Sequence, residues 1–179
     1  MNHLIDILQL STQEIDELVE KAKDIIANPE AYAHKCDGKI LATLFFEPST
    51  RTRLSFESAM LSLGGKTLGF SSANSSSAAK GESVADTVRT VSCYADIIAM
   101  RHPKEGAPLV ASMRSEVPVI NAGDGMNEHP TQALLDMLTM REHLGGLEGA
   151  KVAICGDVMH SRVARSNIYG LTTMGANVV

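Results

Sequence analysis

Hydroxyl and arginine side chains concentrate in one short run, Ser49-Thr50-Arg51-Thr52, separated by two residues from the apolar stretch 40–46. This order is typical of a buried strand followed by a helix, and the first turn of a helix offers unpaired N–H groups and partial positive charge to an anion. The hydroxyls can add donors, and Arg51 can bind a phosphate through two parallel hydrogen bonds. A plain Ser/Thr helix cap with solvated arginines is the alternative, so this run alone leaves phosphate binding open.

Two further segments place polar side chains where predicted strands end. Arg101-His102-Pro103 follows the predicted strand 96–100, and the glycine-rich segment 121–128 leads to His129 and Gln132. The carboxyl ends of parallel strands meet at one edge of a sheet, where ligands collect, and residues three apart share a helical face. A surface arginine and a structural histidine are the plainer interpretations. Taken together, the segments favour a cleft that holds an anion.

The serine-rich segment 73–82 ends in Lys80 beside a glycine. Its composition is typical of a flexible linker, but it could also close over an anion. No Walker-type or dinucleotide-type glycine pattern occurs, which argues against ATP or NAD. A metal bound by Asp124 and His129 is disfavoured because no other ligands follow at metal spacing. We therefore expect no metal and no cofactor.

Composition excludes several classes of protein. The 179 residues are 44% hydrophobic, which is enough for a core, and the formal net charge of −5 argues against a nucleic-acid partner. The sequence contains no run of about 18 apolar residues, so it predicts no membrane span. Its first residues lack the pattern of a signal peptide. The cysteines, Cys36, Cys93 and Cys155, are scattered and follow no metal spacing. We expect reduced thiols in a cytoplasmic protein.

Apolar periodicity and turn residues predict strands that alternate with helices. A capping box of Ser11 and Glu14 begins the first helix, which ends at Asn28-Pro29. Helices are also expected at about 50–63, 82–94, 107–113, 130–143 and 162–174. Strands are expected at 40–46, 66–70, 96–100, 117–121, 151–155 and 176–179, with loops at 71–81 and 122–128. This alternation predicts an α/β fold with a parallel sheet covered by helices on both faces.

The chain divides into two parts at the helix 130–143. Residues 1–134 are predicted to form a first domain, and residues 135–179 the start of a second α/β domain. The helix 130–143 is predicted to connect the two domains. A domain that ended there would lack strands and cover for its sheet. We therefore expect the second domain to be incomplete in this sequence.

Five sequence blocks occur in the order of a known enzyme family. They are Phe-Glu-Pro-Ser-Thr-Arg-Thr-Arg at 46–53, Ser76 with Lys80-Gly81-Glu82, Arg101-His102-Pro103, His129-Pro130-Thr131-Gln132, and Gly156-Asp157 with His160-Ser161-Arg162. Together they resemble the aspartate and ornithine carbamoyltransferases. Ornithine enzymes usually have a cysteine where this chain has Thr131, and they lack the lysine that Lys80 matches. The blocks therefore look like the amino-terminal part of an aspartate carbamoyltransferase catalytic chain.

The resemblance implies a role for each site residue. Ser49, Thr50, Arg51 and Thr52 would hold the phosphate of carbamoyl phosphate. Arg101 would contact the phosphate and the carbamoyl oxygen, to which Thr52 and His129 would also donate. Gln132 would hold the carbamoyl amide, and Arg162 a carboxylate of aspartate. Ser76 and Lys80 would reach a neighbouring subunit's site, with Lys80 among the catalytic groups, which implies a homotrimer with shared active sites.

The resemblance also implies a reaction. The carbamoyl group of carbamoyl phosphate would pass to the α-amine of L-aspartate by direct attack without a covalent intermediate, a step of pyrimidine biosynthesis. Residues 1–134 would be the carbamoyl phosphate domain and 135–179 the start of the aspartate domain. The family's further aspartate-binding residues would follow position 179, so this sequence is expected to bind carbamoyl phosphate without completing an aspartate site.

Two other functions remain open at this point. One is transfer to ornithine or another amine, and the other is a non-catalytic module that binds carbamoyl phosphate. A regulatory chain or a pathway partner leaves no mark in the sequence, so neither is predicted nor excluded.

Overall fold

A parallel sheet of four strands forms the first half of the protein. The computed structural model describes residues 3–75 and 77–179. The strands are β1 (Ile40–Phe45), β2 (Lys66–Phe70), β3 (Ile97–His102) and β4 (Val119–Asp124), in the order β2-β1-β3-β4. Each neighbouring pair is parallel, so every strand returns through a crossover, and all carboxyl ends lie at one edge.

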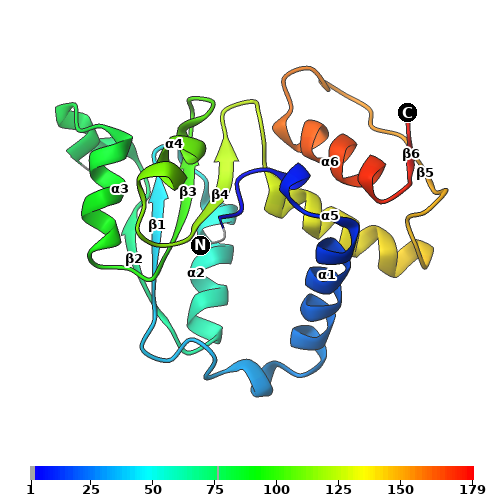
Figure 1. The fold of residues 1–179 in the computed structure, drawn as a ribbon, viewed down its shortest axis with the longest axis horizontal. Coiled ribbons are helices and arrows are strands. Elements are labelled where there is room, and N and C mark those ends of the chain that lie inside the picture. Colours follow the sequence, from blue (N-terminus) through cyan, green and yellow to red (C-terminus); the bar gives the residue numbers. More distant parts are fainter. Residues whose placement is uncertain (1–2, 76) are drawn as a thin grey trace.

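Six α-helices and four short 3₁₀ turns connect and flank the strands of the described chain (Figure 1). The α-helices are α1 (Thr12–Ala27), α2 (Thr50–Ser62), α3 (Val84–Ser92), α4 (Ala107–Arg114), α5 (Pro130–Leu144) and α6 (Arg162–Thr173). The 3₁₀ turns are η1 (Ile7–Gln9), η2 (Pro29–Tyr32), η3 (Ala73–Ser75) and η4 (Ser77–Lys80). The expected α/β fold is confirmed.

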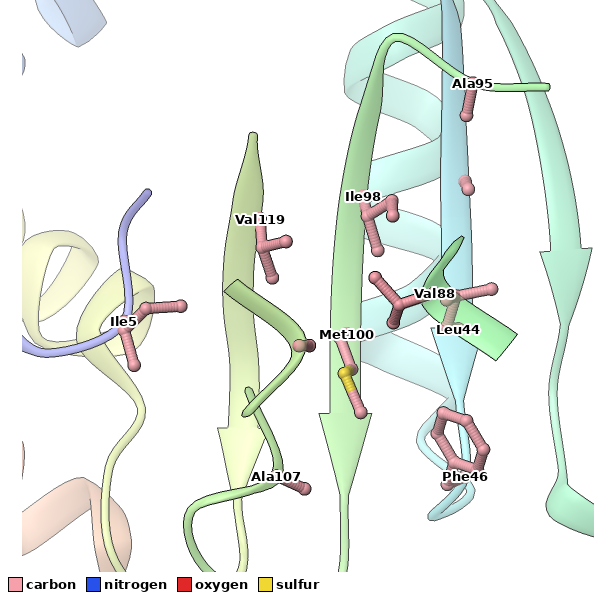
Figure 2. Packing of buried hydrophobic residues seen from close by; sticks show 11 residues of the cluster. Ile5, Leu44, Phe46, Val88, Ala95, Ile98, Met100, Ala107 and Val119 are labelled. Carbon is pink, nitrogen blue, oxygen red and sulfur yellow. The ribbon is translucent and has the colours of Figure 1, made fainter. Parts of the chain in front are cut away.

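Both faces of the four-stranded sheet are covered. Successive side chains of a strand point to opposite faces, so Leu44 and Met100 pack with Val88 of α3 and the buried alanines of α4 (Figure 2). Leu41 and Ala99 point the other way, against Met60 of α2. Arg101 follows Met100 directly, so its side chain lies on the α2 face, beside the start of that helix.

A second apolar cluster lies apart from this sheet. Helices α1, α5 and α6 meet there with β5 (Lys151–Val152) and β6 (Asn177–Val178), which form a parallel pair (Figure 1). Ile15, Val19, Met137 and Leu171 are its largest buried side chains on the helices. Helix α1 therefore contributes its buried face to this cluster rather than to the sheet. The division at 134/135 stays a prediction.

Several predicted boundaries were wrong. Strand β3 continues through Arg101 and His102, because Arg101 pairs with Phe45 and His102 with Asp124. For the same reason β4 extends to Asp124. Helix α3 begins at Val84, since the Ser83 hydroxyl accepts the N–H of Asp86 and caps the helix there. The predicted loop 71–81 contains η3 and η4, and β5 ends at Val152.

The helix ends follow local rules. Ser11 and Glu14 form the predicted capping box of α1, and α5 ends at Gly145, whose φ of 76° lies in the left-handed region that favours glycine. Within the described residues, no helix combines the length and apolar character that crossing a bilayer requires.

Candidate functional site

A cavity of about 730 Å³ lies where the amino termini of α2, α5 and α6 meet the end of β3. Three sequence segments predicted to share an anion site contribute to it, together with the start of α6. The polar side chains that line it are those of Ser49, Arg51, Ser55, Thr52, Arg101, His129, Thr131, Gln132 and Arg162. The structure thus brings together seven of the ten predicted site residues. Apolar side chains of α1, α2, α5 and α6 line the rest of the cavity.

The start of α2 supplies donors on one side of the cavity. Ser49 is the N-cap residue with an extended backbone, and its side chain makes no capping hydrogen bond, so its hydroxyl is available to a ligand. Arg51 is exposed at the cavity, and Thr52 lies beside it. Arg53 points elsewhere, because it pairs with Glu57 at 2.7 Å and Glu57 accepts the Thr43 hydroxyl at 2.8 Å. Arg51 is therefore the arginine of this run that can meet an anion.

Glu47 joins two arginines at the edge of the cavity. Its Oε1 lies 2.6 Å from Arg101 Nη2 and 3.0 Å from Arg162 Nη2, and its Oε2 lies 3.2 Å from Arg162 Nη1. Burial alone would raise the pKa of Glu47, but the hydrogen bonds from Arg162 and Arg101 outweigh it and hold the pKa below its ordinary value. The carboxylate therefore stays charged and orients both guanidinium groups.

His129 is a neutral donor at the cavity wall. Its side chain is 6% exposed, and burial, together with the charges of Arg162 and Arg101, lowers its pKa to about 4. Its backbone N–H donates to Ser166 Oγ at 2.8 Å, which ties the start of α5 to α6. At neutral pH the imidazole carries a single N–H, so it can donate one hydrogen bond without adding charge.

Two predicted residues, Thr50 and Lys80, do not line this cavity. Thr50 is exposed at the first position of α2, where its backbone N–H still belongs to the first turn. Lys80 is exposed at the end of η4. Ser76 lies outside the described residues. Within its own chain, the cavity is therefore formed without the side chains of Thr50 and Lys80.

Two residues that the sequence did not single out shape the site. Glu47 lies two residues after the end of β1, at the carboxyl edge of the sheet, but no local pattern shows its pairing with Arg101 and Arg162. Gly123 has a φ of 136°, and a Cβ added there would lie 3.2 Å from Arg101 Cγ. The arginine side chain therefore passes over the backbone of β4 at a point where other residues would crowd it.

No group of three or more histidine, cysteine, aspartate or glutamate side chains that could hold a metal occurs within the described residues. The three cysteines are free thiols. The polar lining is rich in donors: hydroxyls, guanidinium groups and a neutral imidazole. Such a set can bind a small phosphorylated compound and can stabilise negative charge that develops on a neighbouring oxygen.

Comparison with known proteins identifies the family. The sequence model described as "Aspartate/ornithine carbamoyltransferase, carbamoyl-P binding domain" matches residues 2–142. The chain belongs to the aspartate/ornithine carbamoyltransferase family. The aspartate carbamoyltransferase catalytic subunits of Clostridium perfringens and Clostridium botulinum are each 59% identical over 170 residues, 95% of this chain and 55% of the relative. The chain thus spans about half the length of these carbamoyltransferases.

Solved structures of this family share the fold. The catalytic subunit of M. jannaschii aspartate transcarbamoylase is 48% identical with a TM-score of 0.89, over 99% of this chain and 58% of that chain. Aspartate transcarbamoylase from Trypanosoma cruzi, in complex with carbamoyl phosphate and aspartate, is 38% identical with a TM-score of 0.89, over 95% of this chain and 57% of that chain. The architecture is therefore that of the carbamoyltransferases.

Proposed function

We propose that this chain supplies the carbamoyl phosphate half of an enzyme that transfers the carbamoyl group to the α-amine of L-aspartate, a step of pyrimidine biosynthesis. The observation that carries the proposal is the cavity into which α2, β3 and α5 bring Arg51, Thr52, Arg101, His129 and Gln132. Carbamoyl phosphate offers a phosphate, a carbonyl oxygen and an amide, and this lining has a group for each. The relatives, named as aspartate carbamoyltransferases, support the same reaction.

The phosphate would lie at the start of α2. Ser49 and Thr52 supply hydroxyl donors, Thr50 contributes the backbone of the first turn, and Arg51 and Arg101 supply positive charge. The unpaired N–H groups of the first turn add to this attraction. Charge-assisted hydrogen bonds of this kind are about twice as strong as neutral ones, so the phosphate is the anchor of the substrate.

The carbamoyl oxygen would lie between Thr52, Arg101 and His129. The α-amine of aspartate attacks the carbamoyl carbon, the carbonyl electrons move onto this oxygen, and the three donors stabilise the charge that develops there. The carbonyl then re-forms, the bond to the phosphate oxygen breaks, and phosphate leaves with the electron pair and takes up the proton that the amine loses. Holding both reactants in line supplies much of the acceleration.

Arg162 would bind a carboxylate of aspartate. It lies at the first position of α6 and is held by Glu47 and by the carbonyl oxygen of Gly125 at 2.6 Å. We place it, with residues 135–179, at the start of the aspartate domain, and residues 1–134 in the carbamoyl phosphate domain. The Trypanosoma cruzi complex with both carbamoyl phosphate and aspartate supports this pairing of roles.

The assembly would be a homotrimer with shared active sites in the cytoplasm. Lys80 is exposed and outside the cavity of its own chain, as expected for a residue that reaches a neighbour's site. Ser76 belongs to the same serine-rich segment of the sequence, and we propose the same role for it. The three free thiols are typical of a reducing compartment.

A turnover comparison on a catalytic chain of the length of the relatives tests the proposed reaction. With carbamoyl phosphate present, L-aspartate should be carbamoylated and L-ornithine should not. The assay follows carbamoyl-amino acid and phosphate together, in equal amounts. Preferred carbamoylation of L-ornithine would contradict L-aspartate as the acceptor. Release of phosphate without a carbamoylated product would contradict the transfer.

A further inference from the structure

The carboxylate of Asp136 joins two helices behind the cavity. It lies one turn after Gln132 on α5, and the Nε2 of Gln132 donates to its Oδ1 at 2.9 Å. The Nδ2 of Asn167 on α6 donates to its Oδ2 at 2.6 Å. Gln132 lines the cavity, whereas Asn167 is 7% exposed. Asp136 is therefore held from both sides and cannot turn away from Gln132 without losing a bond to α6.

The chemistry of a carboxylate fixes which end of the Gln132 amide faces it. A carboxylate only accepts hydrogen bonds, so the amide nitrogen must point toward Asp136. The amide is planar, and its oxygen then lies on the other side. No described residue donates to that oxygen, so it remains as the amide atom that a ligand can use. At this point of the cavity the site presents an acceptor rather than a donor.

We propose that Asp136 is a positioning residue that makes Gln132 select a ligand carrying an N–H group. This inference rests on the proposed function, because the N–H group in question is the amide of carbamoyl phosphate. An analogue in which a methyl group replaces that amide has nearly the same shape but leaves the Gln132 oxygen unpaired. Asp136 thus determines specificity without touching the substrate, and Asn167 keeps it in place.

The test is the isosteric change Asp136→Asn. Its remaining oxygen can accept from Asn167, and its new NH₂ group then faces Gln132. The Gln132 amide must turn its own oxygen toward that donor, so it presents NH₂ to the cavity. Titration calorimetry with carbamoyl phosphate, acetyl phosphate and inorganic phosphate reads the outcome as a ratio of affinities.

The unaltered protein should bind carbamoyl phosphate about tenfold more tightly than acetyl phosphate, the usual effect of one neutral hydrogen bond. In Asp136→Asn this ratio should fall to about one, with the affinity for inorganic phosphate unchanged within about twofold. The control Thr139→Ala, an exposed position on α5 whose hydroxyl bonds only within the helix, should keep the tenfold ratio. A folded Asp136→Asn protein that keeps the ratio overturns the inference.

Two further variants keep the test decisive. Should Asp136→Asn fail to fold, Asp136→Ala frees the Gln132 amide to rotate and should lower the ratio part-way, and an unchanged ratio there overturns the inference. In a Gln132→Leu background, Asp136→Asn should not change the affinity ratio further, because both changes remove the contact of the Gln132 oxygen with the N–H group of the ligand. An additional drop in the ratio would contradict the inference, because Asp136 would then act by a route other than Gln132. If the unaltered protein binds none of the three probes, the proposed function itself is contradicted. If the unaltered protein binds carbamoyl phosphate and acetyl phosphate equally, only the inference is contradicted.

Discussion

His129 lies beside two arginines, and the proposed reaction gives it the role of a neutral donor to the carbamoyl oxygen. Its imidazole is buried, and its pKa of about 4 keeps it uncharged throughout the neutral range. A neutral imidazole can donate a hydrogen bond to an oxygen as that oxygen becomes negative. Because the imidazole has no positive charge, it does not pair with the substrate as a counter-ion beforehand. Its contribution should therefore be larger in the transition state than in the bound substrate.

In a catalytic chain of the length of the relatives, His129→Ala should lower turnover about 10²–10³-fold, the usual effect of losing one such donor. The affinity for carbamoyl phosphate should change much less, because the phosphate remains bound at α2. Steady-state kinetics at pH 7 and 8 would separate the two quantities. Unchanged turnover would show that the His129 side chain plays no part in the chemistry.

Glu47 holds two arginines that would otherwise repel each other. The side chains of Arg101 and Arg162 are only 12% and 15% exposed, so losing the shared carboxylate leaves two charges poorly solvated. Glu47→Ala should lower the free energy of unfolding by about 3 kcal/mol. Saturating inorganic phosphate should restore part of the loss, because the anion can pair with Arg101.

Urea unfolding with and without phosphate measures both effects. Glu142→Ala, at an exposed position of α5, is the control and should stay within about 0.5 kcal/mol of the unaltered protein. Equal losses in the two variants would mean that the paired geometry contributes no stability.

At the scale of elements, α5 and α6 are joined by a buried acid. Glu128 is 2% exposed and accepts the Ser166 hydroxyl. Burial raises the pKa of Glu128 to about 7, with Asp6 and Asp124 adding to the rise and Ser166 and Arg165 opposing it. The folded protein therefore holds a proton between about pH 4.5 and 7 that the unfolded chain releases, so stability decreases as pH rises through this window.

Glu128→Gln should remove that pH dependence and keep the acceptor for Ser166. We expect the variant to be about 3 kcal/mol more stable than the unaltered protein at pH 8 and nearly equal to it at pH 4.5. His129 also titrates in this range, but it does so in both proteins, so the difference between them isolates Glu128. Denaturant unfolding at the two pH values gives the answer, and a difference that does not vary with pH would contradict it.

The sequence predicted the elements best where the signals are local. Ser11 and Glu14 are close in the chain, and their capping box marks the start of α1 as expected. The end of β3 was missed because it depends on pairing with β1 and β4, which no local pattern shows. The places of Arg101 and Arg51 in the cavity could be predicted from their positions at the ends of elements. That of Glu47 could not, since its second partner, Arg162, lies 115 residues away.

At the scale of the whole molecule, the proposed trimer makes a prediction about a residue outside the cavity. Lys80→Ala should weaken binding of carbamoyl phosphate about 10–100-fold, the range of a charge-assisted hydrogen bond, because a neighbour's Lys80 completes each site. Lys35→Ala, also exposed, should leave binding unchanged. Sedimentation equilibrium should give three times the 19.1 kDa of one chain. A monomer whose binding ignores Lys80 would contradict shared sites.

In the proposed function every other role depends on binding of the phosphate of carbamoyl phosphate at the start of α2, and two neighbouring arginines test this claim. Arg51 lines the cavity, whereas Arg53 is paired with Glu57 away from it. Titration calorimetry of the protein with carbamoyl phosphate should show binding that Arg51→Ala weakens about 100-fold and that Arg53→Ala leaves within about threefold. Equal affinities in the two variants, or no binding by the unaltered protein, would contradict a phosphate site at α2.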